Sequence, residues 1–328
     1  MTRLSMFYIS SLIGTLMALS SSTWFFIWIG MEINLISFVI ILTQAKARQE
    51  NFMAFIYFLF QEVGSYLLLV GVMLSLLPLP LETLSHWMVI TSLSLKIGLI
   101  PLHYWVLPAF SSISWFNCLF LIIPQKLAPI FILAQVPLLS SSKIVISICA
   151  LTSILWGAQA MMNMTLIRQI IAYSSINQTG WMTMLIVSSP QSFPPYFLIY
   201  STITVALLYP MSQTKARASF SQSNMPDTMD KSSLMFLALA LLSLSGLPPA
   251  FGFTMKWLAL SSAMSSLSPL LTVLMMIAAC VSAYAYLSLA YKTFILAHNK
   301  PMSITPMNYP LYFLLTAPLT LPLIYTTM

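Results

Sequence analysis

The chain has 328 residues, of which 59% are hydrophobic and 6% are charged, and its formal net charge is +7. A soluble globular domain carries about 25% charged residues, so this composition excludes one. The apolar runs are long and do not alternate every second residue, which excludes a β-barrel and indicates an all-α polytopic membrane protein.

Eleven apolar stretches can be drawn as transmembrane helices, and no soluble domain interrupts them, so we expect one transmembrane domain over residues 1–328. Arg3 is followed directly by an apolar run without a cleavage region, so we expect the first helix to stay in the mature protein. The predicted spans are Leu4–Leu19, Trp24–Leu42, Phe52–Leu76, Trp87–Phe110, Asn117–Val136, Ile144–Met161, Arg168–Val187, Tyr196–Met211, Ser233–Ser261, Leu270–Tyr291 and Tyr309–Tyr325.

The basic residues support this division, because nearly all of them fall on one side of the membrane. If the N-terminus defines the first side, that side holds nine of the 13 basic residues, the other side holds only Lys143, and three lie within spans. Basic loops stay on the side of synthesis, so we expect the N-terminus there and the C-terminus opposite. The nine are Arg3, Lys46, Arg48, Arg168, Lys215, Arg217, Lys231, Lys292 and Lys300.

The second span carries a carboxylate near its middle, Glu32 in WIGMEINLISF. In a membrane interior an ionised carboxylate needs a cationic partner. The alternative is a carboxyl group that only joins helices by hydrogen bonds.

The fourth span contains SLKIGLIPLHYW, in which Lys96 precedes Pro101 and His103 follows it. Pro101 removes a backbone hydrogen bond and is expected to break the helix, which is tolerated at membrane depth where the break is buried or lines a hydrated cavity. His103 can carry protons near neutral pH. It can equally be a histidine satisfied by a neighbouring backbone or hydroxyl group.

The fifth span, NCLFLIIPQKLAPIFILAQV, has Lys126 at its midpoint, between Pro124 and Pro129. A lysine at the centre of a membrane helix costs roughly 2.5–3.5 kcal/mol on the insertion scale. Ionisable groups kept at that cost mark functional sites in membrane proteins.

The ninth span contains SGLPPAFGFTMKW, where Pro248 and Pro249 are expected to break the helix ahead of Lys256. Two broken helices in one chain favour an internal repeat of the transporter kind. The alternative for Lys256 is a lysine that extends to the membrane interface.

Other candidate residues carry less information. Glu62, in FLFQEVGSY, lies within the third span and can face a neighbouring helix. Cys118, Cys149 and Cys280 have neither metal nor disulfide spacing. The chain has no phosphate loop and no motif for a nucleotide, flavin, iron–sulfur cluster or haem. A glutamate–lysine pair that forms and breaks would change a lysine's proton affinity, so the buried charges together predict a proton path.

Four ordered motifs, WIGMEINLISF, KIGLIPLHYWVLPAF, PQKLAPIFIL and SGLPPAFGFTMKW, resemble those of NADH–ubiquinone oxidoreductase chain 2. Members of this family are mitochondrially encoded, antiporter-like subunits in the membrane arm of respiratory complex I. The resemblance implies an antiporter-like fold with eleven helices in animal members, in agreement with the topology above. By resemblance, Glu32 and Lys96 form a modulating ion pair, Lys126 is the central proton carrier, His103 belongs to the connecting polar axis, and Lys256 is the terminal lysine.

The resemblance also implies the setting of the chain. It places the protein in the mitochondrial inner membrane, with the N-terminus on the matrix side and the C-terminus on the intermembrane-space side. NADH, FMN, iron–sulfur clusters and ubiquinone would be bound by other subunits, and this chain would hold no redox centre and no metal. Expected partners are other complex I subunits, especially chain 4 and chain 4L, and membrane lipids including cardiolipin, but no nucleic acid.

Two other functions fit the same residues. A stand-alone cation/proton antiporter of this fold would transport ions when purified alone. A structural spacer would use its buried charges only to hold helices together.

Overall fold

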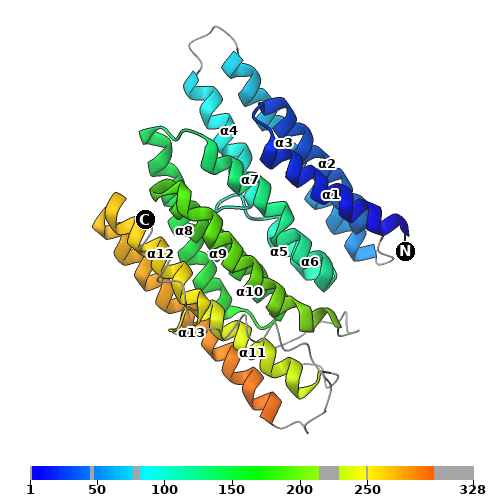
Figure 1. Cartoon of the computed structure of the whole chain (residues 1–328), viewed down its shortest axis with the longest axis vertical. Helices are drawn as coiled ribbons and strands as arrows, with labels where there is room; N and C mark the ends of the chain where they lie inside the picture. The colour runs from blue at the N-terminus through cyan, green and yellow to red at the C-terminus, as the bar shows by residue number, and fades with distance from the viewer. Residues whose placement is uncertain (1, 45–47, 77–81, 214–228, 249, 299–328) are drawn as a thin grey trace. The chain divides into compact units, whose positions relative to one another are not determined.

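The computed structural model describes residues 2–44, 48–76, 82–213, 229–248 and 250–298 (Figure 1). These residues form helices joined by short connections, and none of them lies in a β-strand. The chain divides into two compact units, residues 1–153 and residues 154–328.

The first unit pairs α1 with α2 and α3 with α4, and it packs α7 against α1, α2 and α4. Two short helices, α5 and α6, lie between α4 and α7 in the sequence, and α8 begins in this unit and ends in the second. The helices are α1 Thr2–Ser20, α2 Trp24–Thr43, α3 Arg48–Leu76, α4 Glu82–Ile97, α5 Val106–Ser112, α6 Trp115–Ile122, α7 Pro124–Gln135 and α8 Ser140–Asn163.

Two glycines explain how closely α1 and α2 approach each other. A Cβ atom on Gly14 would lie 2.8 Å from the carbonyl oxygen of Gly30, and a Cβ atom on Gly30 would lie 2.8 Å from the carbonyl oxygen of Gly14. Small residues at such contacts let membrane helices pack backbone to backbone. This pairing holds α2, and with it Glu32, against α1 in the first unit.

The second unit packs α11 against α10, α12 and α13, and α12 also contacts α9. Helix α9 is buried along nearly all of its length although it contains the polar run SSINQT. Polar side chains in a membrane helix are stable when they face other helices, so α9 is an interior helix of this unit. The elements are α9 Ile167–Ser188, the short 3-10 helix η1 Pro190–Ser192, α10 Phe193–Gln213, α11 Lys231–Ser245, α12 Phe251–Ser266 and α13 Pro269–His298.

Six helices among the described residues are long and apolar enough to cross a membrane. The polar run of α9 explains why that helix is not one of them, although it has 22 residues. The predicted eleventh span, Tyr309–Tyr325, lies outside the described residues. The six are Trp24–Thr43, Asn51–Leu76, Trp115–Gln135, Ser140–Asn163, Pro190–Ser212 and Pro269–His298.

Three predicted spans each contain two helices in the structure. The fourth contains α4 and α5, the fifth contains α6 and α7, and the ninth contains α11 and α12. Each of these three spans contains one of the buried lysines.

Candidate functional site

Lys96 lies in the last turn of α4 and is 4% exposed. Its side chain runs over Gly64 of α3, where a Cβ atom would lie 3.0 Å from Lys96 Cγ. Any larger residue at position 64 would therefore displace the lysine. The glycine on α3 sets the course of the lysine side chain.

Two carboxyl groups surround this lysine. Glu32 of α2 and Glu62 of α3 both interact electrostatically with Lys96, and they also interact with each other. Neither carboxylate lies within 4 Å of the Lys96 ammonium, so the expected Glu32–Lys96 pair is a through-space interaction without direct contact. The structure thus brings together three ionisable groups.

Ser65 links the two carboxyl groups. Its hydroxyl lies 3.3 Å from Glu62 Oε2 and 2.8 Å from the Glu62 carbonyl oxygen, and it also acts on the Glu32 carboxyl as a hydrogen-bonding neighbour. Glu32 Oε1 is buried and has no hydrogen-bond partner among the described residues. A hydroxyl proton can serve only one acceptor at a time, so Ser65 can favour either carboxyl group.

Helix α4 ends at a glycine. Gly98 has φ +81°, its N–H donates to the Leu95 carbonyl, and the N–H of Leu99 donates to the Ser94 carbonyl. This is the Schellman arrangement, in which a left-handed residue closes a helix. Pro101, which the sequence predicted as the helix break, lies in the connection that follows.

Two carbonyls at this end of α4 accept hydrogen bonds from neutral side chains. The indole N–H of Trp105 donates to the Leu95 carbonyl at 3.0 Å, and the Gln61 amide donates to the Lys96 carbonyl at 3.3 Å. The Lys96 ammonium is therefore not needed to cap its own helix.

His103 lies in the connection between α4 and α5 and is 9% exposed. Its Nδ1 is 3.3 Å from the Pro101 carbonyl oxygen, and its ring stacks on Tyr104 with 4.9 Å between centroids. The backbone contact is the one that the structural alternative predicted for this residue. Its role in proton transfer stays a prediction.

Lys126 is 1% exposed and lies in the first turn of α7. Pro124 occupies the first position of that helix, where the missing N–H costs nothing, while Pro129 lies inside it. The pair of prolines therefore places Lys126 near a helix N-terminus, close to Ile123, the single residue that separates α6 from α7.

The residue before the lysine, Gln125, joins three helices. Its Nε2 donates to Asn34 Oδ1 of α2 at 2.8 Å, and its Oε1 accepts from the Tyr57 hydroxyl of α3 at 2.9 Å. None of these three residues was predicted from the sequence as part of the site. The signal available was Gln125 beside a mid-span lysine, since a buried amide must find partners on other helices.

Lys256 lies in α12 of the second unit and is 7% exposed. Its Nζ donates to the carbonyl oxygen of Ser245, the last residue of α11, at 2.7 Å, and to Ser282 Oγ of α13 at 3.3 Å. The ammonium therefore occupies the negative end of the α11 helix dipole. It is buried among α11, α12 and α13, so the expectation of a lysine at the membrane interface is not needed to explain its position.

Glycines also shape the end of α11. Gly246 has φ +79°, and a Cβ atom on it would lie 2.8 Å from Lys256 Cδ. A Cβ atom on Gly252 would collide with the Ser243 carbonyl, so α12 starts directly against the end of α11. Pro248 lies in the connection and Pro249 lies outside the described residues.

The structure places Glu32, Lys96, His103 and Lys126 in the first unit and Lys256 in the second. Within the first unit it brings together Glu32 and Lys96, and it adds Glu62. No group of three or more His, Cys, Asp or Glu side chains that could hold a metal ion occurs in the part of the chain that the structure describes.

Comparison with known proteins identifies consistent relatives. The family described as NADH:quinone oxidoreductase/Mrp antiporter, TM, matches residues 21–282. The chain is 32% identical over 307 residues to NADH-ubiquinone oxidoreductase chain 2 of Locusta migratoria, covering 92% of this chain and 89% of that protein. It is 38% identical over 269 residues to the protein of the same name from Lumbricus terrestris, covering 80% and 78% of the two chains.

Among solved structures, the fold is similar to that of a chain in respiratory complex I from Thermus thermophilus with bound aureothin. The TM-score is 0.77 at 24% sequence identity, and the match covers 92% of this chain and 73% of that chain. At this identity the similarity shows a shared fold.

Proposed function

The chain belongs to the NADH:quinone oxidoreductase/Mrp antiporter family of transmembrane proteins, and on that premise we propose that it is a proton-translocating membrane-arm subunit of respiratory complex I. Its curated relatives are named chain 2 of NADH-ubiquinone oxidoreductase, which favours this function over a stand-alone antiporter. The same names support the mitochondrial inner membrane as its location.

The observation that carries the proposal is the burial of three lysines. Lys96, Lys126 and Lys256 are 4%, 1% and 7% exposed in a chain with very few charges. Inserting a lysine at the centre of a membrane helix costs roughly 2.5–3.5 kcal/mol. A residue that served only for packing could be apolar and would avoid that cost. Proton transfer by the lysine amines explains why these residues are buried.

Each group has a role in this proposal. Glu32 and Glu62 set the charge environment of Lys96, because both interact with it electrostatically without direct contact and such an interaction varies with the separation of the charges. A movement that changes their separation changes how tightly Lys96 holds its proton. Lys126 is then the central carrier and Lys256 the terminal one, with His103 as a connecting group.

The helix interruptions have a role as well. We take α4 with α5, and α11 with α12, as two discontinuous membrane helices within an eleven-helix antiporter-like domain that spans residues 1–328. Breaks at membrane depth let backbone carbonyls and water reach the lysines. The interruption in each unit is consistent with an internal repeat.

The proposal includes the orientation of the chain and its partners. The N-terminus faces the matrix and the C-terminus the intermembrane space, as the distribution of basic residues indicates. The chain binds no redox cofactor, and NADH, FMN, iron–sulfur clusters and ubiquinone are held by other subunits. The neighbouring subunits include chains 4 and 4L, and cardiolipin is a lipid partner.

Purification in mild detergent tests the class of function. We expect the chain to co-purify with subunits that show flavin and iron–sulfur absorbance, and to transport no ions when reconstituted alone. Autonomous cation/proton exchange by the isolated chain would support the stand-alone antiporter instead.

Substitution of the central lysine tests the mechanism. Lys126→Met keeps a long side chain without charge, so we expect the complex to assemble while NADH:ubiquinone turnover and proton pumping fall together. Lys143→Met, at an exposed position of α8, is the matched control and should change neither rate. Normal pumping by an assembled Lys126→Met complex would contradict the proposal.

A further inference from the structure

The side-chain amide of Gln125 connects the two helices that carry the carboxyl groups of the site. Helix α2 carries Glu32 and Asn34, and helix α3 carries Tyr57 and Glu62. Gln125 Nε2 donates to Asn34 Oδ1 at 2.8 Å, and Gln125 Oε1 accepts from the Tyr57 hydroxyl at 2.9 Å. We call Asn34, Tyr57 and Gln125 the amide clamp. Through it, one side chain of α7 reaches both helices.

The amide clamp is shielded from solvent. Asn34 and Tyr57 are 4% and 1% exposed. The Tyr57 ring also packs edge to face against Phe38 of α2, with 5.4 Å between the ring centroids. A buried polar atom that loses its partner pays the full cost of its desolvation, so both hydrogen bonds are costly to break. The amide clamp is therefore a stable connection between α2, α3 and α7.

The amide clamp acts on the start of α7. Lys126 directly follows Gln125, and both lie in the first turn of that helix. The N-cap residue, Ile123, makes no capping hydrogen bond with its side chain, and Pro124 has no N–H to donate. A helix end without a side-chain cap depends on other contacts to stay in place. The two hydrogen bonds of Gln125 supply such contacts and hold the backbone of the neighbouring Lys126.

A single planar amide makes both hydrogen bonds, and this limits how far the two partner helices can separate. If α2 and α3 move relative to each other, either one of the hydrogen bonds breaks or Gln125 follows the movement. The same movement changes the distance between Glu32 of α2 and Glu62 of α3. A change at the carboxyl groups is therefore tied by contiguous contacts to the position of Lys126.

We propose that Gln125 is a positioning residue that transmits relative movement of α2 and α3 to Lys126. While the amide clamp is intact, a change in the spacing of these helices displaces the first turn of α7, and with it the lysine. The three clamp residues themselves transfer no proton. This inference rests on the proposed function, because it takes Lys126 as a proton carrier.

Breaking the amide clamp at either end distinguishes positioning from packing. Tyr57→Phe removes the hydrogen bond to α3, and Asn34→Leu removes the one to α2. If the residues only pack, their turnover losses should multiply in the double variant. If they position Lys126, one break already disconnects the amide clamp. The double variant should then turn over no more slowly than the more impaired single variant.

The experiment uses the assembled complex in membrane vesicles and measures NADH:ubiquinone turnover, acidification and thermal stability. We expect Tyr57→Phe, Asn34→Leu and Gln125→Leu each to lower turnover and pumping together by roughly tenfold. This lies within the roughly 100-fold that a displacement of about 1 Å can cost. Tyr57→Phe, which removes one hydroxyl, decides the outcome if the leucine variants do not assemble.

Tyr8→Phe is the matched control. The Tyr8 hydroxyl of α1 donates to Asn117 Oδ1 of α6 at 2.6 Å, so it makes the same kind of hydrogen bond between two helices of the first unit. No lysine lies next to that amide in the sequence. Tyr8→Phe should lower thermal stability about as much as Tyr57→Phe does, and it should leave turnover and pumping unchanged.

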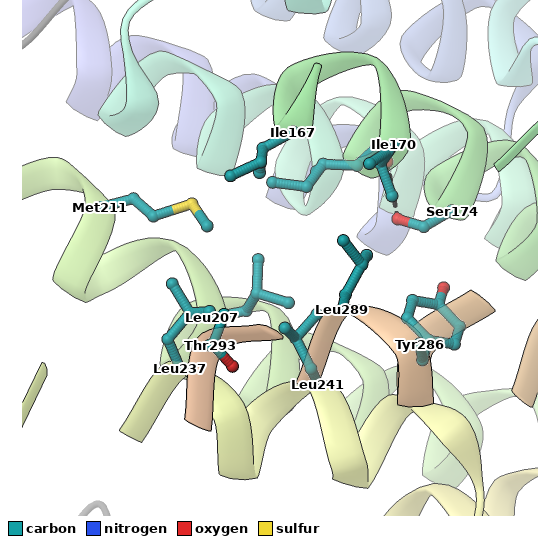
Figure 2. A pocket seen from close by; sticks show the side chains of 11 residues that line it. Ile167, Ile170, Ser174, Leu207, Met211, Leu237, Leu241, Tyr286, Leu289 and Thr293 are labelled. Carbon is teal, nitrogen blue, oxygen red and sulfur yellow. Dashed lines mark hydrogen bonds between the residues drawn. The ribbon is translucent and has the colours of Figure 1, made fainter. Parts of the chain in front are cut away.

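Tyr286→Phe controls for the loss of a buried tyrosine hydroxyl by itself. Figure 2 shows Tyr286 of α13 at one end of a pocket whose walls are mainly apolar. The residue is 2% exposed, and its hydroxyl has no hydrogen-bond partner among the described residues. Its removal breaks no connection between helices, so both rates should stay unchanged.

Lys126→Met, measured in the same preparation, separates this inference from the proposed function. If Lys126→Met abolishes pumping while Tyr57→Phe is fully active, Gln125 does not position the lysine and the proposed function stands. If Lys126→Met is itself active, the proposed function fails at this lysine, and the inference fails with it. Equal turnover losses in Tyr8→Phe and Tyr57→Phe, or multiplying losses in the double variant, would show a structural effect and overturn the positioning role.

Discussion

Helices α4 and α11 both end at a glycine with left-handed backbone angles, φ +81° at Gly98 and φ +79° at Gly246. The carbonyls at the end of α4 accept from the Trp105 indole and the Gln61 amide, which are neutral. The last carbonyl of α11 accepts from the Lys256 ammonium. Neutral donors thus cap the C-terminus of α4 in the first unit, whereas a charged donor caps the C-terminus of α11 in the second.

This difference separates the two lysines chemically. Lys96 is left to interact with two carboxyl groups, which can themselves gain or lose protons. Lys256 interacts with a peptide carbonyl and a helix dipole, which cannot, and a cation there gains about 0.3–2 kcal/mol. The first lysine is therefore adjustable by neighbouring charge, whereas the second is held by a fixed dipole and can be changed mainly by movement of the helix end.

The largest effect is expected from removing the charged donor. Lys256→Met leaves the Ser245 carbonyl without its ammonium partner and removes a proton carrier, so we expect turnover and pumping to fall by about 100-fold, a typical contribution of one proton-transfer group. Turnover and acidification in vesicles measure this. Lys292→Met, an exposed position of α13, is the control. Equal rates in both variants would show that α11 does not need a cation.

The adjustable character of Lys96 can be tested with its carboxyl groups. Glu32→Gln and Glu62→Gln each leave one carboxylate near the lysine, whereas the double variant leaves none. We expect the double variant to lose about fivefold more turnover than the product of the two single losses, a coupling of about 1 kcal/mol. Losses that simply multiply would show that the two carboxyl groups act independently of each other and would contradict a shared action on Lys96.

A smaller effect is expected from replacing the glycines that end α4 and α11. Ala in a left-handed conformation costs about 1–2 kcal/mol, and we expect Gly246→Ala and Gly98→Ala to lower thermal stability by similar amounts. Only Gly246→Ala should also reduce turnover, because its Cβ atom would displace Lys256, whereas that of Gly98→Ala would meet Val106. Equal turnover in the two variants would show that the Lys256 position is not critical.

The smallest effect is expected at a neutral donor. Trp105→Phe removes the indole N–H from the Leu95 carbonyl, which still accepts from Gly98, and it shortens a ring that is 1% exposed, so we expect a stability loss of about 1–3 kcal/mol. Turnover should change less than about twofold, within the range of a modest stability effect. Thermal unfolding and steady-state turnover measure both. A large turnover loss would indicate that Trp105 contacts the proton path.

Part of the site was predictable because burial of charge is visible in sequence. A lysine or glutamate inside a span of about 20 apolar residues cannot reach water without reorganising the helix, so Glu32, Lys96, Lys126 and Lys256 stand out. The helix interruptions were also expected, but their cause was assigned to proline. In the structure α4 ends at Gly98 and α11 ends at Gly246, because both helix ends use a left-handed residue, which favours glycine, and Pro101 and Pro248 only follow.

The sequence by itself determined that this is a helical membrane protein with buried amines, because hydropathy and charge are local properties of each span. Tertiary structure alone decided which groups meet: Glu62 beside Lys96, Gln125 between Asn34 and Tyr57, and Lys256 at the end of α11. These contacts join residues from different helices, and their partners depend on helix rotation and depth. A single sequence does not encode those quantities in any local pattern, because they follow from the packing of the whole bundle.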